Sequence, residues 1–303
     1  LHLSLRRQRQ MCIRDRIISV SLPFSSHIAA YIINKKNKKE WVMDIGDPFT
    51  LKKDAPENNR ILYGFLNRYY ENKFYSLASK IIFTHEDARS AHIDYFDIET
   101  KKTYIGNPIS NFKEEIYSAS LEYNYNSHPK KFGYFGVFTK GVRSPKNFMN
   151  FFKETENIEF HWYVNDDSKN EIASHNKELN SIFHSIVERE EALKLMAGSF
   201  HCLVSIGNLN TTQIPSKVIE YISTGKPVIH FCEVENDPVK NIANEFQNLF
   251  IISETSNKEN LLNQLNSFYK DISTFNKELF ICLLYTSDAA DEGLGVDLGG
   301  RRI

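Results

Sequence analysis

The sequence lacks the features that mark secreted, membrane-spanning and nucleic-acid-binding proteins. Its 303 residues include four cysteines, Cys12, Cys202, Cys232 and Cys282, and no two of them have CxxC spacing, so neither a disulfide framework nor a zinc site is indicated. No apolar run approaches the length of a membrane span, and no secretory signal pattern is visible. The formal net charge is −1, which argues against binding of nucleic acid through bulk positive charge. These absences favour a reducing, cytoplasmic compartment.

The chain does contain enough apolar residues for the cores of two ordinary domains. Hydrophobic residues make up 41% of the sequence and aromatic residues 13%. Apolar runs at 17–22, 41–44, 81–84 and 103–106 predict strands that alternate with helices, and a second alternation starts with a strand at 132–138. Because βαβ alternation is typical of parallel sheets, the predicted fold class is α/β with two Rossmann-like domains.

The most informative stretch is residues 213–231, QIPSKVIEYISTGKPVIHF. Pro215 suits the first position of a helix, since its missing N–H group has no partner there in any case. Ile214 would then occupy the cap position, which an apolar side chain cannot fill, so the amides of Ser216, Lys217 and Val218 are left for an external acceptor. Phosphate is the natural candidate.

Two charged residues of the same helix fit a nucleotide. Lys217 adds a positive charge beside the expected phosphate, and Glu220, one turn further along, offers a carboxylate that can accept from two sugar hydroxyls. The alternative is an ordinary crossover helix in which Lys217 and Glu220 form an i,i+3 ion pair. Gly225 is predicted to end the helix in the left-handed conformation, before an apolar strand at 228–231.

This stretch resembles the donor-binding segment of family 4 glycosyltransferases of the GT-B fold, which carry a P-S-K-x-x-E-Y-x-x-x-G-K-P run. The resemblance implies a nucleotide-diphosphate sugar at the helix start, with Pro215, Ser216 and Lys217 near the diphosphate and Glu220 on the ribose. Many family members carry a second glutamate eight residues earlier, near the donor sugar. Here that position is Thr212.

The other parts of the predicted donor site come from the resemblance of residues 134–145, YFGVFTKGVRSP, to the first strand and loop of the family's donor domain. Gly136 lies at the end of the strand. Arg143 matches the arginine that neutralises the diphosphate leaving group, while Lys140 and Lys146 are weaker candidates. Phosphates bind beyond the carboxyl ends of such strands.

The first domain supplies three candidates. His27, in the first turn of a predicted helix, matches a histidine that sits near the reacting sugar in related enzymes; a surface histidine without a role is the alternative. Asp44 and Asp47 lie at the carboxyl end of the strand at 41–44 and are candidates for the acceptor side. Their DxxD spacing differs from the DxD motif of metal-dependent glycosyltransferases, so we expect no required metal and no cofactor beyond the donor substrate.

A wide apolar and aromatic stripe at residues 60–79 predicts a helix that is mostly core. Lys35, Lys36, Lys38 and Lys39 lie nearby in sequence, so the alternative is peripheral contact with a membrane or a lipid acceptor. Solvated basic faces are, however, common.

The predicted organisation has four parts. Residues 17–120 form an N-terminal acceptor-side domain without its beginning, and residues 121–281 form the nucleotide-sugar domain. Residues 1–16 and 282–303 resemble conceptual translations of sequencing-adapter sequence, although a genuine basic arm and acidic tail are the alternative.

The function that the resemblance implies is transfer of a hexose to a saccharide or lipid-linked saccharide. The resemblance also implies that the anomeric configuration is retained. It implies a role in bacterial cell-surface polysaccharide biosynthesis. A sugar-nucleotide 2-epimerase on the same fold is the alternative enzyme, although the sequence offers no cluster of carboxylates or histidines for proton abstraction. A nucleotide-binding fragment that does not turn over is the third possibility.

Overall fold

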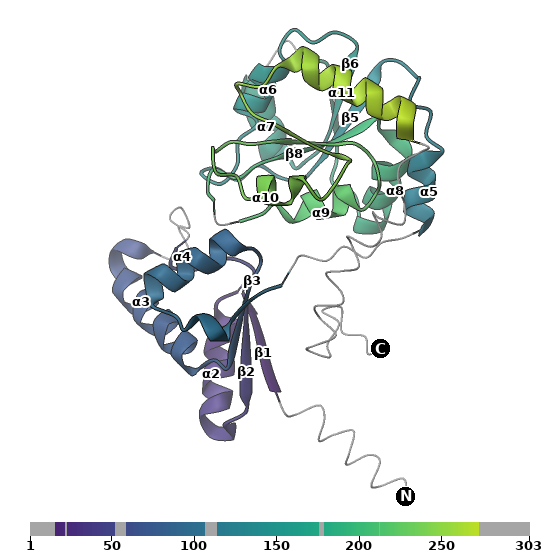
Figure 1. Cartoon of the computed structure of the whole chain (residues 1–303). Helices are drawn as coiled ribbons and strands as arrows, with labels where there is room; N and C mark the ends of the chain where they lie inside the picture. The colour runs from purple at the N-terminus through teal and green to yellow at the C-terminus, as the bar shows by residue number, and fades with distance from the viewer. Residues whose placement is uncertain are drawn as a thin grey trace, which may run out of the picture. The chain divides into compact units, whose positions relative to one another are not determined.

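The computed structural model of the chain describes residues 16–21, 23–51, 59–106, 114–175, 179–211 and 213–272. The chain divides between Asn107 and Pro108 into two compact units, unit 1 and unit 2 (Figure 1). The adapter-like segments lie outside the described residues, except for Arg16. That residue begins the first strand, and its Nε lies 2.8 Å from Glu40 Oε2 of the neighbouring strand.

Unit 1 is a four-stranded parallel sheet in the order β1-β2-β3-β4. The strands are β1 (Arg16–Ser21), β2 (Glu40–Ile45), β3 (Lys80–Phe83) and β4 (Thr103–Ile105). Their connections contain α2 (Ser25–Asn37), α3 (Arg60–Leu77), α4 (Glu86–Phe96) and the 3-10 turn η2 (Thr100–Lys102). The four predicted strands are therefore confirmed, with bounds that differ by at most one residue. Trp41 and Ile81 are completely buried in the core of the unit.

Helix α3 departs from the expectation that its apolar stripe is mostly core. Phe74 and Tyr75 are buried, but Ile61 is 98% exposed and Phe65 is 82% exposed. The first half of α3 thus presents large apolar side chains to solvent, where the sequence pattern had predicted a covered face. No helix among the described residues is both long and apolar enough to span a bilayer.

Unit 2 is a six-stranded parallel sheet between two layers of helices. Its strands are β5 (Lys130–Phe135), β6 (Ile158–Tyr163), β7 (Ser181–His184), β8 (Cys202–Ile206), β9 (Val228–Phe231) and β10 (Leu249–Ile252). Its helices are α5 (Glu114–Leu121), α6 (Lys146–Phe152), α7 (Asp166–His175), α8 (Arg189–Ser199), α9 (Ser216–Ile222), α10 (Val239–Ala243) and α11 (Lys258–Asp271). One core cluster joins the sheet to α6, α7 and α11, and another joins it to α5, α8, α9 and α10 (Figure 1).

The strand order of unit 2 is β10-β9-β8-β5-β6-β7. The chain therefore starts in the middle of the sheet, moves outward through β6 and β7, and then crosses to β8 on the other side of β5. This is the doubly wound Rossmann order, whose topological switch point lies between the first and fourth strands of the unit. Ligands of such sheets bind at the carboxyl ends of the strands at that point, here β5 and β8.

Helix α5 belongs to unit 2, although the predicted domain boundary lay after residue 120. Its Tyr117 is completely buried and packs on Gly225, where an added Cβ atom would come within 2.6 Å of the ring. Gly225 has a φ of +74° at the end of the turn that follows α9, as its sequence position predicted. The packing of a tyrosine ring on a left-handed glycine thus attaches α5 to unit 2, whereas the sequence had predicted that residues up to 120 belong to the first domain.

A buried tyrosine holds α9 against the end of β5. The backbone N–H group of Phe135 donates to the hydroxyl of Tyr221 at 2.9 Å, and the hydroxyl donates back to the carbonyl of Phe135 at 3.0 Å. The β5–β8 pairing covers only Phe132 and Gly133 of β5, so the two strands have separated by Phe135. The Tyr221 side chain takes the place of a neighbouring strand there, and it satisfies both backbone groups in a buried site.

We predict that Tyr221→Phe lowers the free energy of unfolding by about 1–3 kcal/mol, because it leaves two buried backbone groups without a partner. Urea denaturation measures this change. Tyr163→Phe is the matched control: its ring stacks on Phe135, but its hydroxyl makes no hydrogen bond among the described residues. A loss for Tyr221→Phe no larger than that of the control would show that the bonds to Phe135 contribute nothing.

Lys226 is completely buried at the amino end of β9. Its Nζ donates to the hydroxyl of Tyr125 at 3.2 Å and lies 3.9 Å from the ring centroid of Tyr123. Ring faces favour the ammonium form. Burial nevertheless lowers the pKa of Lys226 to about 6. The unfolded chain therefore binds one more proton than the folded chain between about pH 6 and the ordinary lysine pKa of roughly 10.4.

It follows that stability rises with pH across this window, by at most about 1.4 kcal/mol per pH unit from this group. We predict that Lys226→Met removes much of the increase in the free energy of unfolding between roughly pH 7 and pH 9. The control is Lys194→Met, at an exposed position on α8. Equal pH slopes for the wild type and Lys226→Met would contradict the prediction.

Candidate functional site

The switch point of unit 2 brings two loops together. β5 and β8 are paired only through Phe132–Cys202 and Gly133–Leu203. Beyond these pairs the strands part, and the loop that follows each begins at Gly136 and Gly207. Two polar groups lie at this edge of the sheet: one comes from β8, β9 and the segment between β9 and α10, and the other comes from the two loops.

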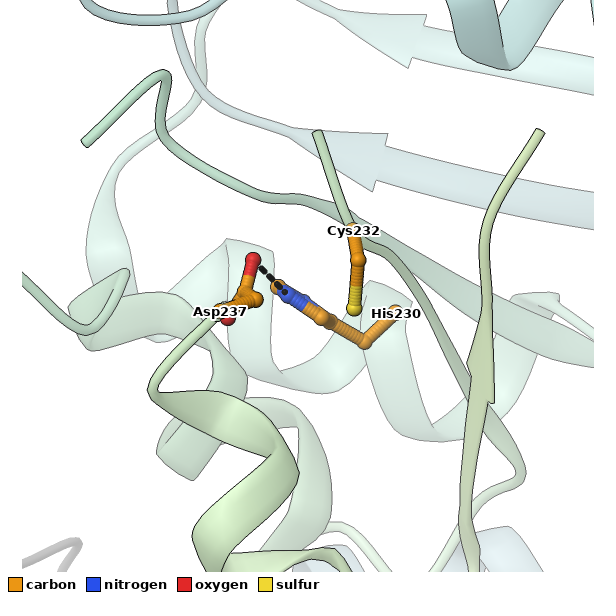
Figure 2. Close-up of side chains that lie close together, drawn as sticks. All are labelled: His230, Cys232 and Asp237. Carbon is orange, nitrogen blue, oxygen red and sulfur yellow. Dashed lines mark hydrogen bonds and ion pairs between the residues drawn. The ribbon is translucent and has the colours of Figure 1, made fainter. Parts of the chain in front are cut away.

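The first group is buried and consists of His230, Cys232 and Asp237, whose candidate ligand atoms lie within 4.8 Å of one another (Figure 2). Nδ1 of His230 is 3.0 Å from the hydroxyl of Ser205, and Nε2 is 3.1 Å from Oδ2 of Asp237. Both ring nitrogens therefore have protein partners. Burial raises the pKa of the Cys232 thiol to about 12, which favours the protonated form over the thiolate that binds metals. The group fits a closed hydrogen-bond network better than a metal site.

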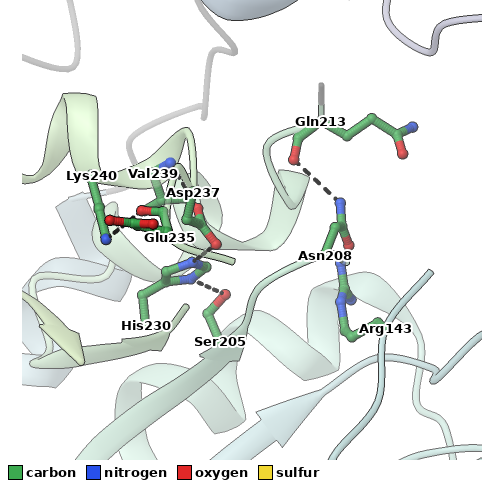
Figure 3. Close-up of polar contacts among 9 residues, drawn as sticks. All are labelled: Arg143, Ser205, Asn208, Gln213, His230, Glu235, Asp237, Val239 and Lys240. Carbon is green, nitrogen blue, oxygen red and sulfur yellow. Dashed lines mark hydrogen bonds and ion pairs between the residues drawn. The ribbon is translucent and has the colours of Figure 1, made fainter. Parts of the chain in front are cut away.

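The second group joins the two loops through Arg143 (Figure 3). Its Nη2 donates to Oδ1 of Asn208 at 2.8 Å, and Nδ2 of Asn208 donates to the carbonyl of Gln213 at 3.3 Å. A backbone bond of 2.7 Å from Leu209 N to the carbonyl of Val142 ties the same loops. Nε of Arg143 is buried and has no acceptor among the described residues. Arg143 as a whole is half-buried, so part of its guanidinium stays accessible to a ligand at the switch point.

The start of α9 follows this loop, with two differences from the prediction. Pro215 is the N-cap rather than the first helical residue, and it makes no side-chain cap, so Ile214 lies outside the helix. The amide of Val218 donates to the carbonyl of Pro215 at 3.0 Å and is not available to a ligand. The amides of Ser216 and Lys217 have no acceptor in the described part of the chain. Two amides, rather than three, face outward.

The charged residues of α9 do not pair with each other. Oε1 of Glu220 accepts from Nε and Nη2 of Arg189, at 3.1 and 2.9 Å. Glu220 therefore pairs with Arg189, and the Lys217–Glu220 ion pair that was the alternative prediction does not form. Lys217 is half-buried and makes no ion pair within the described segments. Arg189 begins α8, beyond the end of β7. The second oxygen of Glu220 retains its acceptor capacity.

The remaining predicted donor-site residues differ in exposure. Gly136 continues β5, and its N–H group donates to the carbonyl of Tyr163 at 3.1 Å. Lys140 and Lys146 are exposed and make no ion pair with any described residue. Thr212 lies outside the described residues.

In unit 1, His27 is completely buried, which rules out the alternative of a surface histidine. Its Nδ1 lies 2.7 Å from Oγ of Ser19, which itself accepts from Nε1 of Trp41 at 2.8 Å. Because Ser19 has no other acceptor among the described residues, we assign its hydroxyl as the donor to Nδ1, which places the ring hydrogen of His27 on Nε2. This Nε2 is buried and has no partner in the described structure.

We predict that His27 stays neutral at physiological pH, because burial lowers its pKa to about 4. A ¹⁵N-edited NMR titration of histidine rings, with His27→Gln to assign the signal, should show no His27 transition between about pH 5 and pH 8. A midpoint above pH 6 would contradict the structure around this ring.

Asp44 and Asp47 lie at the predicted edge of the sheet of unit 1. Asp44 belongs to β2, and Asp47 follows it, with its N–H group donating to Oγ of Ser21 at 3.4 Å. A separate cavity of about 160 Å³ in unit 2 is lined by Phe132, Ile158 and Tyr269, among others. It lies at the amino ends of β5 and β6, away from the two polar groups.

Comparisons with known proteins agree with this topology. Sucrose-phosphate synthase from Thermosynechococcus elongatus is similar, with a TM-score of 0.64 and 12% identity over 92% of this chain and 72% of that chain. HepE from Anabaena, solved in complex with UDP-glucose, gives a TM-score of 0.59 and 13% identity over 92% and 74%. WaaG, a glycosyltransferase involved in lipopolysaccharide biosynthesis, gives 0.52 and 14% over 88% and 78%. No family model and no curated protein matches the chain.

The chain has the fold of GT-B glycosyltransferases. Its two parallel sheets correspond to the two Rossmann-like domains that the sequence predicted. At 12–14% identity, the likeness establishes this fold and not a substrate or an activity.

Sequence reasoning missed two residues that shape this edge of unit 2. Tyr221 stands next to Glu220 in the recognised motif, so its position was visible, but its hydroxyl bonds to β5 were not. Nothing in the sequence signalled that Arg189, 31 positions before Glu220, would hold that carboxylate.

Proposed function

We propose that this chain is a glycosyltransferase that moves a hexose from a nucleotide-diphosphate sugar to a saccharide or lipid-linked acceptor. The observation that carries the proposal is Arg143 at the switch point, where its guanidinium is half-buried and is fixed by the hydrogen bond from Nη2 to Oδ1 of Asn208. The fold supports it, since HepE, which shares the fold, was solved with UDP-glucose. The base and the sugar of the donor are not specified by these residues.

The diphosphate is proposed to lie between Arg143 and the start of α9. Arg143 and Lys217 provide positive charge, and the amides of Ser216 and Lys217 add two donors. As the bond to the sugar breaks, negative charge grows on the departing diphosphate, and fixed donors aimed at that charge stabilise the transition state. This electrostatic assistance requires no metal ion, in keeping with the absence of a DxD motif.

Glu220 is proposed to bind the ribose. Its Oε1 is held by Arg189, which leaves Oε2 to accept from a sugar hydroxyl. The pair is partly exposed and contributes little to stability, about 0.2–1 kcal/mol. The ion pair with Arg189 would instead serve to orient the Glu220 carboxylate.

His27 is proposed as a hydrogen-bond donor near the reacting sugar because of the resemblance to family 4 enzymes; its ring is completely buried in unit 1, so this role requires a rearrangement that exposes Nε2. The neutral ring, with Nδ1 engaged by Ser19 and a hydrogen on Nε2, supports this role over that of a general base. Asp44 and Asp47 are proposed for the acceptor side. Retention of configuration follows from the resemblance to family 4 enzymes.

The protein is proposed to be cytoplasmic, and peripheral contact with a membrane is proposed for the case in which the acceptor is lipid-linked rather than a free saccharide. The exposed apolar side chains of α3, with Ile61, Leu62 and Phe65 each more than 70% exposed, support contact with lipid. The formal charge of −1 gives no support for a nucleic-acid partner.

Calorimetric titration with UDP and GDP tests the site. We predict that Arg143→Ala weakens binding of the preferred nucleotide at least tenfold, since a lost hydrogen bond to a charged group costs about 1.5–3 kcal/mol. Lys217→Ala and Glu220→Ala should each weaken it about three- to tenfold. Lys194→Ala, on the exposed face of α8, is the control. Affinities within twofold of wild type for all three variants would remove this site from the account.

Incubation of the chain with a nucleotide sugar, with and without a saccharide acceptor and in the presence of EDTA, separates the proposed reaction from its alternatives. A glycosylated acceptor supports the transferase. An epimerised nucleotide sugar formed without acceptor would instead identify a 2-epimerase, and tight nucleotide binding without either product would identify a binding fragment.

A further inference from the structure

The buried group at His230 lies directly against the loop that follows β8. Asn208 of that loop accepts a hydrogen bond from Arg143. Ser205, His230 and Asp237 come from β8, β9 and the segment before α10, and each is at most 3% exposed. Figure 3 shows that Ser205 of this group and Asn208 of the Arg143 group stand on the same segment, formed by β8 and the loop that follows it. None of the three side chains is exposed enough to bind a substrate itself.

The point of contact is Gly207, the first residue of the loop. A Cβ atom placed on Gly207 would lie 2.4 Å from Oδ2 of Asp237, 3.1 Å from the carbonyl oxygen of Phe231 and 3.3 Å from the amide of Glu233. The Asp237 carboxylate thus fills the space that the missing side chain leaves. The N–H group of Gly207 also donates to the carbonyl of Phe231 at 2.8 Å.

Asp237 is itself held from two sides. Its Oδ2 accepts from His230 at 3.1 Å, and its Oδ1 accepts from the amide of Val239 at 2.9 Å, at the start of α10. His230 is in turn fixed by Ser205, at 3.0 Å from Nδ1. The carboxylate therefore has one position, set by β8, β9 and α10 together.

We propose that Asp237 and His230 are positioning residues: the carboxylate packed on Gly207 sets the course of the loop and so places Asn208 to orient Arg143. The inference rests on the proposed function for its consequence, a diphosphate bound by Arg143. Its structural part, the coupling of Asp237 to the loop, does not depend on any ligand.

Two pairs of variants test the coupling. Gly207→Ala introduces the clash with Asp237, while Gly198→Ala is the matched control, since a Cβ atom on Gly198 of α8 meets nothing within 4 Å. Asp237→Leu removes the acceptors and keeps the number of side-chain heavy atoms, and Asp237→Asn retains an oxygen for the Val239 amide and a polar group for His230. Thermal unfolding of each variant checks that it is folded.

The first readout is amide hydrogen exchange of the segment 207–211 without any nucleotide. Gly207→Ala and Asp237→Leu should exchange at least tenfold faster there than wild type, whereas Gly198→Ala should match it. Equal exchange in all variants would overturn the proposal, whatever the protein binds.

The second readout is affinity for UDP or GDP. Gly207→Ala and Asp237→Leu should weaken nucleotide binding about tenfold. Asp237→Asn should bind within about threefold of wild type. If Asp237 only stabilised the fold, Asp237→Leu would lower the unfolding temperature without weakening nucleotide binding. Folded variants that bind as wild type does would overturn the proposal and leave the proposed function standing. No binding by wild type, with the exchange effect intact, would instead refute the proposed function.

Metal analysis of the purified protein gives an independent outcome. The network as described needs no ion, because Nε2 of His230 donates to Asp237. One equivalent of zinc per chain would overturn the proposal, since His230 and Asp237 would then be metal ligands.

Discussion

The candidate site depends on how the chain fills the gap where β5 and β8 separate. A parallel sheet cannot part its strands inside a protein without leaving backbone groups unsatisfied, and unsatisfied buried groups are costly. Here the hydroxyl of Tyr221 occupies both the N–H and the carbonyl of Phe135. The same two hydrogen bonds hold α9 beside the gap between β5 and β8. The Tyr221 side chain therefore both satisfies the backbone of β5 and positions α9 at the candidate site.

The opening is then lined by loops that are themselves anchored. Asn208 links the two loops through Arg143, and Gly207 rests on the carboxylate of Asp237. Charged and polar side chains are held by protein partners before any ligand arrives. Such preorganisation limits the entropy lost when a ligand binds, and it matters most where charge develops during a reaction.

Much of the fold could be predicted from the sequence, because its apolar runs alternate with helical patterns at short intervals. The strands β1 to β4 fall within one residue of their predicted bounds, and Gly225 takes the left-handed conformation that its place after α9 indicated. The boundary between the units was harder. α5 follows a polar stretch, and it is assigned to unit 2 by tertiary packing: Tyr117 belongs to the core cluster of α8, α9 and α10 and packs on Gly225.

The site was only partly predictable. The motif at residues 213–231 located Lys217 and Glu220, but partners distant in sequence, such as Arg189, depend on tertiary contacts that no local pattern encodes. The amide of Val218 was wrongly predicted to be available to a ligand. In the structure it donates to the carbonyl of the cap residue, Pro215, within the first turn of α9. Likewise the burial of His27 arises from Ser19 and Trp41, which lie on neighbouring strands.

The most direct test of a diphosphate site at the switch point is a crystal structure of the chain soaked with UDP or GDP. The account predicts density for the diphosphate within hydrogen-bond distance of Arg143 and of the amides of Ser216 and Lys217. Density for the nucleotide elsewhere, for example in the cavity at the amino ends of β5 and β6 and none at Arg143, would contradict it.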